Sequence, residues 1–190
     1  MIIFIHGFGS SGFSFKAQKT KEYFKNREVV LSPSLSYVPY LAIDTLEQII
    51  EYALPKESVY LIGSSLGGFY SIYLSNKYDI KAVLVNPAVN AHKTLGKYEG
   101  MATNYYDLSK FEWNNSHVKQ LENLIVEHPK EENFLLMLQK GDEVLDYKEA
   151  LNKLPNATLI LEDGGDHSFT NYEKHMPTIE SFFKVKNYIK

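Results

Sequence analysis

The stretch Val59-Tyr60-Leu61-Ile62-Gly63-Ser64-Ser65-Leu66-Gly67-Gly68 joins a short apolar run to a segment with helical periodicity. Residues 63–67 fit the pattern G-x-S-x-G, which forms a tight strand-to-helix turn that exposes the middle serine. Glycines leave room for the close contacts of such a turn, and the amino end of the following helix favours negative charge beside the serine. The pattern predicts Ser65, not Ser64, as a nucleophile. A glycine-rich packing turn is the alternative for this short pattern alone, so other residues must decide.

Short apolar runs alternate with helix-like segments along the rest of the chain, which is typical of a parallel sheet covered by helices on both faces. The expected strands lie near residues 1–6, 28–32, 58–62, 81–86, 133–138 and 157–162. The expected helices cover residues 15–26, 41–54, 66–77, 146–154 and 176–190. We therefore expect an α/β protein with a compact α/β-hydrolase fold. Its open, mostly parallel sheet would have about six strands, in a single domain over residues 1–190.

Residues 88–130 break this alternation, because they lie between the fourth and fifth expected strands and are too long for a simple crossover. The segment is rich in aromatic side chains, among them Tyr98, Tyr105, Tyr106 and Trp113. Two interpretations stay open. The segment is either a cap inserted over a site or a longer helical crossover that only covers the sheet.

A serine hydroxyl is a weak nucleophile at neutral pH, so a serine enzyme needs a histidine base and a carboxylate that orients it. In the α/β-hydrolase fold these groups follow in the order serine, acid, histidine. Asp142 comes directly after the expected strand 133–138 and is the predicted acid. Asp146 is the less favoured alternative, because it stands at a helix start where Asp is a common N-cap. His167 follows the strand 157–162 in a glycine-containing loop and is the predicted base.

The loop His6-Gly7-Phe8-Gly9-Ser10-Ser11-Gly12 follows the first expected strand. In this fold that position supplies one oxyanion donor, so the backbone N–H groups of Phe8 and Leu66 are the predicted oxyanion hole. Residues 7–12 also fit G-x-G-x-x-G, the fingerprint of dinucleotide-binding oxidoreductases. That function requires an acidic residue at the end of the next strand, and Val29-Val30-Leu31-Ser32-Pro33 contains none. The dinucleotide interpretation is therefore disfavoured.

Composition excludes several classes of partner and cofactor. The 190 residues include 20 Lys and Arg against 23 Asp and Glu, a net charge of −3, which gives no overall positive field for nucleic acid. The chain has no Cys and no H-E-x-x-H motif, so we expect no metal and no cofactor. No apolar run approaches the ~20 residues of a membrane span. We expect a cytoplasmic protein that acts on a small-molecule substrate. Its oligomeric state is open.

Several motifs occur together in a fixed order: His-Gly-Phe-Gly-Ser-Ser (6–11), Gly-Ser-Ser-Leu-Gly-Gly (63–68), Val-Asn-Pro-Ala-Val (85–89), Gly-Asp-Glu-Val-Leu-Asp-Tyr (141–147) and Gly-Gly-Asp-His-Ser-Phe (164–169). This set resembles the YqiA-type esterase family of small bacterial α/β hydrolases. The resemblance implies a cytoplasmic bacterial serine esterase for carboxylic esters, with acyl-CoA thioesters as a further candidate class. It places the triad on Ser65, Asp142 and His167. A hydrolase-fold binding protein without catalysis is the alternative function. The inserted segment departs from the family pattern, so substrate preference does not transfer.

Overall fold

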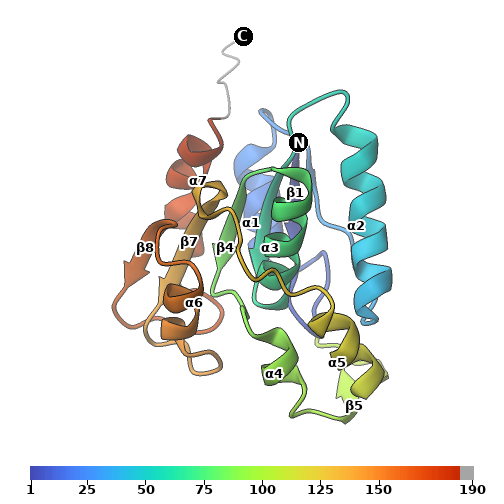
Figure 1. The fold of residues 1–190 in the computed structure, drawn as a ribbon. Coiled ribbons are helices and arrows are strands. Elements are labelled where there is room, and N and C mark those ends of the chain that lie inside the picture. Colours follow the sequence, from blue (N-terminus) through green and yellow to red (C-terminus); the bar gives the residue numbers. More distant parts are fainter. Residues whose placement is uncertain (185–190) are drawn as a thin grey trace.

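The computed structural model describes residues 1–184 and contains one main sheet (Figure 1). Its six strands are all parallel and lie in the order β2-β1-β3-β4-β7-β8. Their bounds are β1 (Ile2–Ile5), β2 (Val30–Leu31), β3 (Tyr60–Ser64), β4 (Ala82–Val85), β7 (Phe134–Gln139) and β8 (Thr158–Glu162). The predicted open parallel sheet is confirmed, strand for strand.

Helices cover both faces of this sheet (Figure 1). They are α1 (Phe15–Phe24), α2 (Pro39–Ala53), α3 (Leu66–Tyr78), α6 (Tyr147–Lys153) and α7 (Met176–Phe183), with short 3-10 helices at η1 (Glu131–Asn133) and η2 (Tyr172–His175). Helices α1 and α7 pack on one face, and α2, α3 and α6 pack on the other. The helix expected over 176–190 begins as predicted, and residues 185–190 of that prediction lie outside the described residues.

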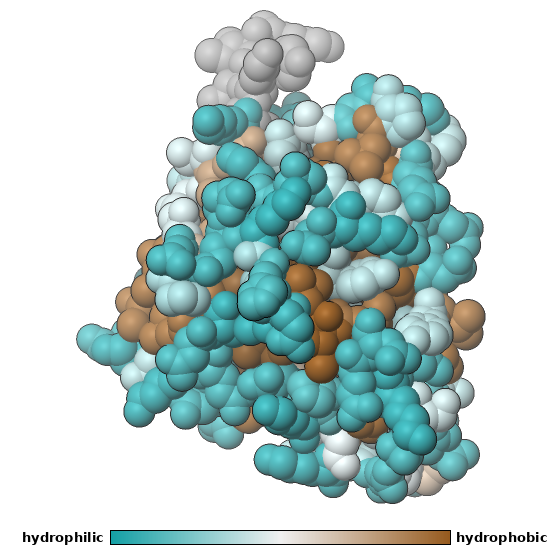
Figure 2. Space-filling view, viewed as in Figure 1, coloured by the Kyte–Doolittle hydropathy of each residue, from teal (hydrophilic) through white to brown (hydrophobic). Residues whose placement is uncertain are grey.

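Alternate residues of the strands face the two helical layers, as the pleat of an extended chain requires. In β1, Ile3 and Ile5 join the core under α2 and α3, whereas Ile2 and Phe4 join the core under α1 and α7. All four side chains are buried. A strand that is covered on both faces has no polar side, which explains the unbroken apolar run at its position in the sequence. The outer surface in the same view is mostly hydrophilic, with hydrophobic residues in a band across the middle (Figure 2).

Residues 88–130 contain both helices and a β-hairpin. Their elements are α4 (Ala91–Leu95), β5 (Gly100–Thr103), β6 (Lys110–Trp113) and α5 (Asn115–Glu122). Strands β5 and β6 pair antiparallel and form a sheet of their own. The indole of Trp113 donates to the carbonyl of Leu95 at 3.1 Å, and Gln120 of α5 accepts from the backbone N–H of Tyr40 at 3.0 Å. The segment is thus tied internally and to α2.

The parallel strands bring their carboxyl ends to one edge of the sheet, which is where binding sites form in such folds. The elements α4, β5 and α5 of residues 88–130 lie at this same end, the lower end in Figure 1. The loops after β1, β3, β7 and β8 meet there and carry the residues predicted from the sequence. Within residues 1–184, no helix is both long and apolar enough to span a membrane.

Candidate active site

Ser65 occupies the sharp turn between β3 and α3, with φ 55° and ψ −118°. A non-glycine residue at positive φ is strained, and such strain persists only where the surroundings fix it. The Ser65 N–H donates to Val85 O at 3.1 Å, and its carbonyl accepts from Ala88 N at 3.0 Å. A Cβ on Gly63 would lie 2.2 Å from Gly67 O, and one on Gly67 would lie 2.0 Å from Ile5 O. The turn therefore requires both glycines of the G-x-S-x-G pattern.

His167 lies between Ser65 and Asp142. Its Nε2 is 3.1 Å from Ser65 Oγ, and its Nδ1 is 2.9 Å and 3.0 Å from the two carboxylate oxygens of Asp142. The Asp142 side chain is 2% exposed and the His167 side chain 23%. Asp142 Oδ1 also accepts from the N–H groups of Val144 and Leu145, at 2.9 Å each. The folded chain thus places these three predicted side chains in one line of hydrogen bonds.

Asp146, the alternative acid, lies at the start of α6. Its side chain accepts from the backbone N–H of Lys148 at 3.0 Å, which is the usual interaction of an N-cap. It therefore satisfies a helix terminus, while Asp142 contacts the imidazole.

The loop after β1 lies against Ser65. A Cβ on Gly7 would be 3.2 Å from Ser65 Cβ and 3.7 Å from Ser65 Oγ. Leu66 is the first residue of α3, and first-turn N–H groups have no partner inside a helix. Within residues 1–184, the N–H groups of Phe8 and Leu66 donate no hydrogen bond to another protein atom. Neither N–H group is thus occupied by a protein acceptor within these residues.

The hairpin of residues 88–130 packs against this loop. The Phe8 ring packs edge-on against Phe111 and Trp113, with ring centroids 5.5 Å and 4.9 Å apart. The carbonyl of Gly9 accepts from the N–H of Tyr105 at 2.7 Å. The position of the Phe8 backbone consequently depends on a segment that is distant in sequence.

His6 braces the same loop from within the core. Its side chain is buried, with Nδ1 2.8 Å from Gly7 O and Nε2 accepting from the N–H of Leu35 at 2.9 Å. A neutral imidazole that carries its proton on Nδ1 satisfies both contacts. Burial lowers the pKa of His6 below its ordinary value, which favours this neutral form.

The glycine spacing that also fits a dinucleotide fingerprint has a packing explanation here. Gly7 faces Ser65, and a Cβ on Gly12 would lie 1.9 Å from the carbonyl oxygen of Ser32. The Ser32 hydroxyl donates to Gly12 O at 2.7 Å. The end of β2, where a dinucleotide site would need its acidic residue, is instead hydrogen-bonded to the loop.

Sequence reasoning missed three side chains that contact the loop of His167. Lys16, in the first turn of α1, donates from Nζ to Ser168 O at 2.8 Å. Burial lowers the pKa of Lys16 to about 8, although the charges of Asp166 and Asp142 oppose this shift. Asn86 and Gln139 contact the same loop from β4 and β7. All three are far from His167 in sequence. Asn86 lies in the motif Val-Asn-Pro-Ala-Val (85–89), but nothing in that motif indicates a contact with the loop of His167.

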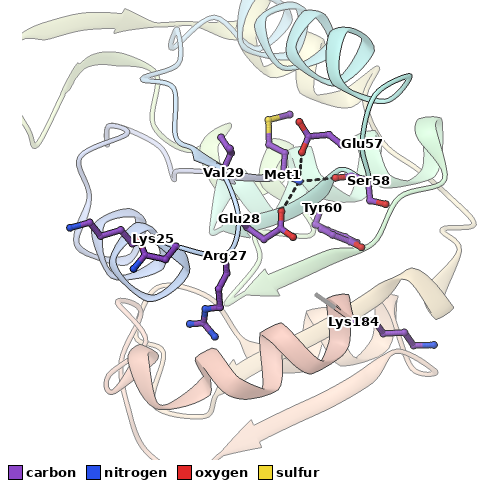
Figure 3. A pocket seen from close by; sticks show the side chains of 10 residues that line it. Met1, Lys25, Arg27, Glu28, Val29, Glu57, Ser58, Tyr60 and Lys184 are labelled. Atoms are coloured by element: carbon purple, nitrogen blue, oxygen red, sulfur yellow. Dashed lines mark hydrogen bonds and ion pairs between the residues drawn. The ribbon is translucent and has the colours of Figure 1, made fainter. Parts of the chain in front are cut away.

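A separate hollow of about 720 Å³ lies at the other end of the sheet, beside the amino end of β1 (Figure 3). Charged groups line it and pair with one another: the Met1 ammonium is 3.0 Å from both Glu28 and Glu57 and 2.8 Å from Ser58 O. The triad residues do not line it. Among residues 1–184, no group of three or more His, Cys, Asp or Glu side chains is arranged to hold a metal ion.

Known structures share this fold over nearly the whole chain. Alpha/beta hydrolase domain-containing protein 10 from mouse matches with a TM-score of 0.70 and 18% identity, over 96% of this chain and 89% of its own. Est1E from Butyrivibrio proteoclasticus matches with a TM-score of 0.72 and 17% identity, over 96% and 85%. The monoacylglycerol lipase of Paleococcus ferrophilus matches with a TM-score of 0.67 and 17% identity, over 97% and 94%.

These likenesses confirm the predicted α/β-hydrolase fold. The family suggested by the sequence motifs is confirmed as well. A family model matches residues 1–184, and the chain belongs to the uncharacterised protein family UPF0227.

Proposed function

We propose that the protein is a serine hydrolase that cleaves carboxylic esters, with Ser65 as nucleophile, His167 as base and Asp142 as orienting acid. The observation that carries this proposal is the unbroken line of hydrogen bonds from Ser65 Oγ through both ring nitrogens of His167 to Asp142. Such a line activates a hydroxyl that is otherwise a weak nucleophile. The fold, which is shared with esterases and lipases, agrees with it.

In the first half of the reaction, Ser65 Oγ attacks the ester carbonyl carbon while its proton moves to Nε2 of His167. The negative charge that forms on the carbonyl oxygen accepts hydrogen bonds from the N–H groups of Phe8 and Leu66. The carbon–oxygen bond to the alcohol then breaks, and His167 gives its proton to the leaving alcohol. The acyl group stays on Ser65 as an ester.

In the second half, His167 takes a proton from water as the water oxygen attacks the acyl carbon. The bond to Ser65 Oγ breaks, the proton returns to that oxygen, and the carboxylic acid leaves. Asp142 remains ionised throughout, keeps the proton of the neutral ring on Nδ1 and stabilises the imidazolium when it forms.

Substrate choice in this proposal belongs to residues 88–130, which act as a cap on a single domain. Their hairpin touches residues 6–12, here called the oxyanion loop, through Phe111, Trp113 and Tyr105. That loop lies against Ser65. The same chemistry serves oxygen esters and acyl-CoA thioesters, since both present an electrophilic carbonyl. We keep both classes as candidate substrates.

A fluorophosphonate probe tests the nucleophile directly, because it reacts with an activated serine without any need to know the substrate. We expect covalent labelling of the wild type and of Ser64→Ala, and none of Ser65→Ala. Ser64 is the matched control, being the adjacent serine and buried in β3. A folded wild type that takes up no probe would refute the proposal and favour a hydrolase-fold binding protein without catalysis.

The substrate class requires a second measurement. Turnover of p-nitrophenyl esters and acyl-CoAs of graded chain length should show one preferred length, with activity abolished in Ser65→Ala. Activity on acyl-CoAs alone would narrow the function to a thioesterase, and activity on the p-nitrophenyl esters alone would remove the thioester candidate.

A further inference from the structure

Residues 163–170, here called the histidine loop, are held by two buried amide side chains. The first is Asn86, which follows β4 and is 3% exposed. Its Nδ2 donates to the carbonyl of Asp166 at 3.0 Å and to that of His167 at 3.4 Å. Its Oδ1 accepts from the N–H of Gln139 at 3.0 Å. One side chain thus joins the backbone of His167 to the end of β7.

The second amide is Gln139, the last residue of β7, which is 2% exposed. Its Oε1 accepts from the N–H groups of Asp166 and Thr170, at 3.1 Å and 2.9 Å. Its Nε2 donates to Glu162 Oε2 at 2.7 Å and to Thr170 O at 2.8 Å. Gln139 therefore spans the histidine loop from one end to the other.

The histidine loop lacks helix or strand structure that would fix it. Gly164 and Gly165 have φ values of 70° and 77°, and Phe169 has a φ of 63°. A Cβ on Gly165 would lie 2.1 Å from Gln139 Oε1, so the loop backbone rests directly on this amide. The position of His167 is thus set by side chains from other elements, and an unpaired buried amide would be costly if the loop moved away.

We propose that Asn86 is a positioning residue. By holding the backbone of His167, it keeps the imidazole within hydrogen-bond distance of both Ser65 and Asp142. Asn86 binds the backbone of His167 on one side and the N–H of Gln139 on the other, three residues before Asp142. It follows the strand next to β3, which carries the turn of Ser65. The catalytic part of this inference rests on the proposed function, whereas the geometric part does not.

The hydrogen-bond partners of residue 86 require a side chain with both a donor and an acceptor, as an amide has. Two backbone carbonyls face Nδ2 and need a donor, while the N–H of Gln139 faces Oδ1 and needs an acceptor. A carboxylate would present oxygens to the carbonyls of Asp166 and His167. Asn also suits the backbone here, since residue 86 has φ 41°, in the left-handed region that Asn tolerates.

Two substitutions of Asn86 distinguish the contribution of its side-chain hydrogen bonds from that of its backbone conformation. Asn86→Gly adopts positive φ without strain and removes the amide. Asn86→Asp keeps the shape and the acceptor for Gln139 but removes both donated hydrogen bonds. Asn171→Gly is the matched control, because Asn171 has φ 64°, is exposed, and makes no side-chain hydrogen bond within residues 1–184.

We expect kcat for ester hydrolysis to fall about 10- to 100-fold in Asn86→Gly and Asn86→Asp, with KM near the wild-type value, because a shift of the base acts on the chemical step. We also expect the far-downfield proton resonance of His167 Nδ1–H, which reports the contact with Asp142, to disappear or move. Asn171→Gly should leave kcat and the resonance unchanged.

A folded Asn86→Gly with wild-type kcat and an unchanged resonance would overturn the inference. A lowered melting temperature with both readouts intact would also overturn it, since that result means a structural role alone. If Asn86→Gly does not fold, the isosteric Asn86→Asp decides by the same readouts. If the wild type hydrolyses no ester, the proposed function fails, and the proton resonance alone still tests whether Asn86 positions His167.

Discussion

At the scale of single residues, Asp142 and Asp146 show one residue type in two different environments four positions apart. Asp142 accepts from the His167 ring and from two backbone N–H groups, whereas Asp146 accepts from the N–H of Lys148. Asp142 thus contacts an imidazole, whereas Asp146 caps the start of α6. This difference gives the acid assignment a matched pair of variants.

Asp142→Asn should lower kcat by about 10³- to 10⁴-fold, because an amide does not hold the imidazole in the required tautomer or stabilise its charged form. Asp146→Asn should keep kcat within a few-fold, because Asn is also a good N-cap and changes stability by less than about 1 kcal/mol. Ester turnover and urea unfolding measure the two effects. Full activity in Asp142→Asn together with loss in Asp146→Asn would reverse the assignment of the acid.

His6 makes stability depend on pH. Burial lowers its pKa in the folded protein below the ordinary 6.5, so the folded chain resists a proton that the unfolded chain accepts. As pH falls below 6.5, the unfolded state binds more protons and becomes favoured. The contribution is therefore complete above 6.5 and decreases as pH falls toward the pKa of the folded state.

Urea unfolding of wild type and His6→Gln at about pH 7.5 and about pH 5.5 isolates this effect, because the other titrating groups are common to both proteins. We expect the wild type to lose more stability than His6→Gln between the two pH values. His6→Gln need not match the wild type at either pH, since only the difference between pH values is compared. Equal losses would mean that His6 takes up its proton as easily in the folded state as in the unfolded one.

At the scale of elements, the turn between β3 and α3 requires that the backbones of β1, β3 and α3 lie in close contact. A Cβ on Gly67 would meet the carbonyl oxygen of Ile5 at 2.0 Å, and Ile5 is itself paired with Gly63. Relief of that clash would separate α3 from the sheet. Gly164, by contrast, has a φ of 70° and no heavy atom within 4 Å of an added Cβ.

Gly67→Ala should therefore cost about 3 kcal/mol or more, or prevent folding, through overpacking against the backbone. Gly164→Ala should cost only about 1–2 kcal/mol, the strain of a left-handed alanine. Urea unfolding and the yield of folded protein measure both. Equal stability of the two variants would show that β1 moves easily away from α3.

Much of the fold could be predicted because parallel strands covered on both faces leave continuous apolar runs, as in residues 1–5. The placement of Ser65, Asp142 and His167 followed from the same logic, since each comes after a strand end. The hairpin β5–β6 was not predicted. Its strands are four residues each, and Met101 in β5 is largely exposed, so periodicity is weak. The contact between Asn86 and the histidine loop was not predicted for another reason: its partner Asp166 is 80 residues away.

At the scale of the whole molecule, residues from the sheet, from the helices on both of its faces and from residues 88–130 form or contact the candidate site. Lys16 reaches the histidine loop from α1 on one face of the sheet, and Ser65 directly precedes α3 on the other. The sheet contributes Asn86 and Gln139, and residues 88–130 contact the oxyanion loop. The loops at this edge are thus fixed by contacts over long sequence separations. Changes outside the triad should alter the chemistry for that reason.

Phe8 tests this coupling, because its ring is the contact between the oxyanion loop and the aromatic side chains of Phe111 and Trp113. Phe8→Ala leaves the proposed N–H donor in place but removes its anchor. We expect a loss of about 2 kcal/mol in stability, below the range for a fully buried Phe since this ring is half-buried. We also expect kcat to fall about tenfold, less than the loss of an entire oxyanion donor.

Phe13→Ala is the matched control. Phe13 lies in the same loop region, is 57% exposed and stacks on Tyr106 with centroids 5.4 Å apart. Its removal should cost about 0.5–1 kcal/mol and leave kcat unchanged. Urea unfolding and ester turnover of both variants decide the point. If Phe8→Ala lost stability but kept full kcat, the backbone of Phe8 would hold its place without the hairpin, and residues 88–130 would act on substrate choice alone.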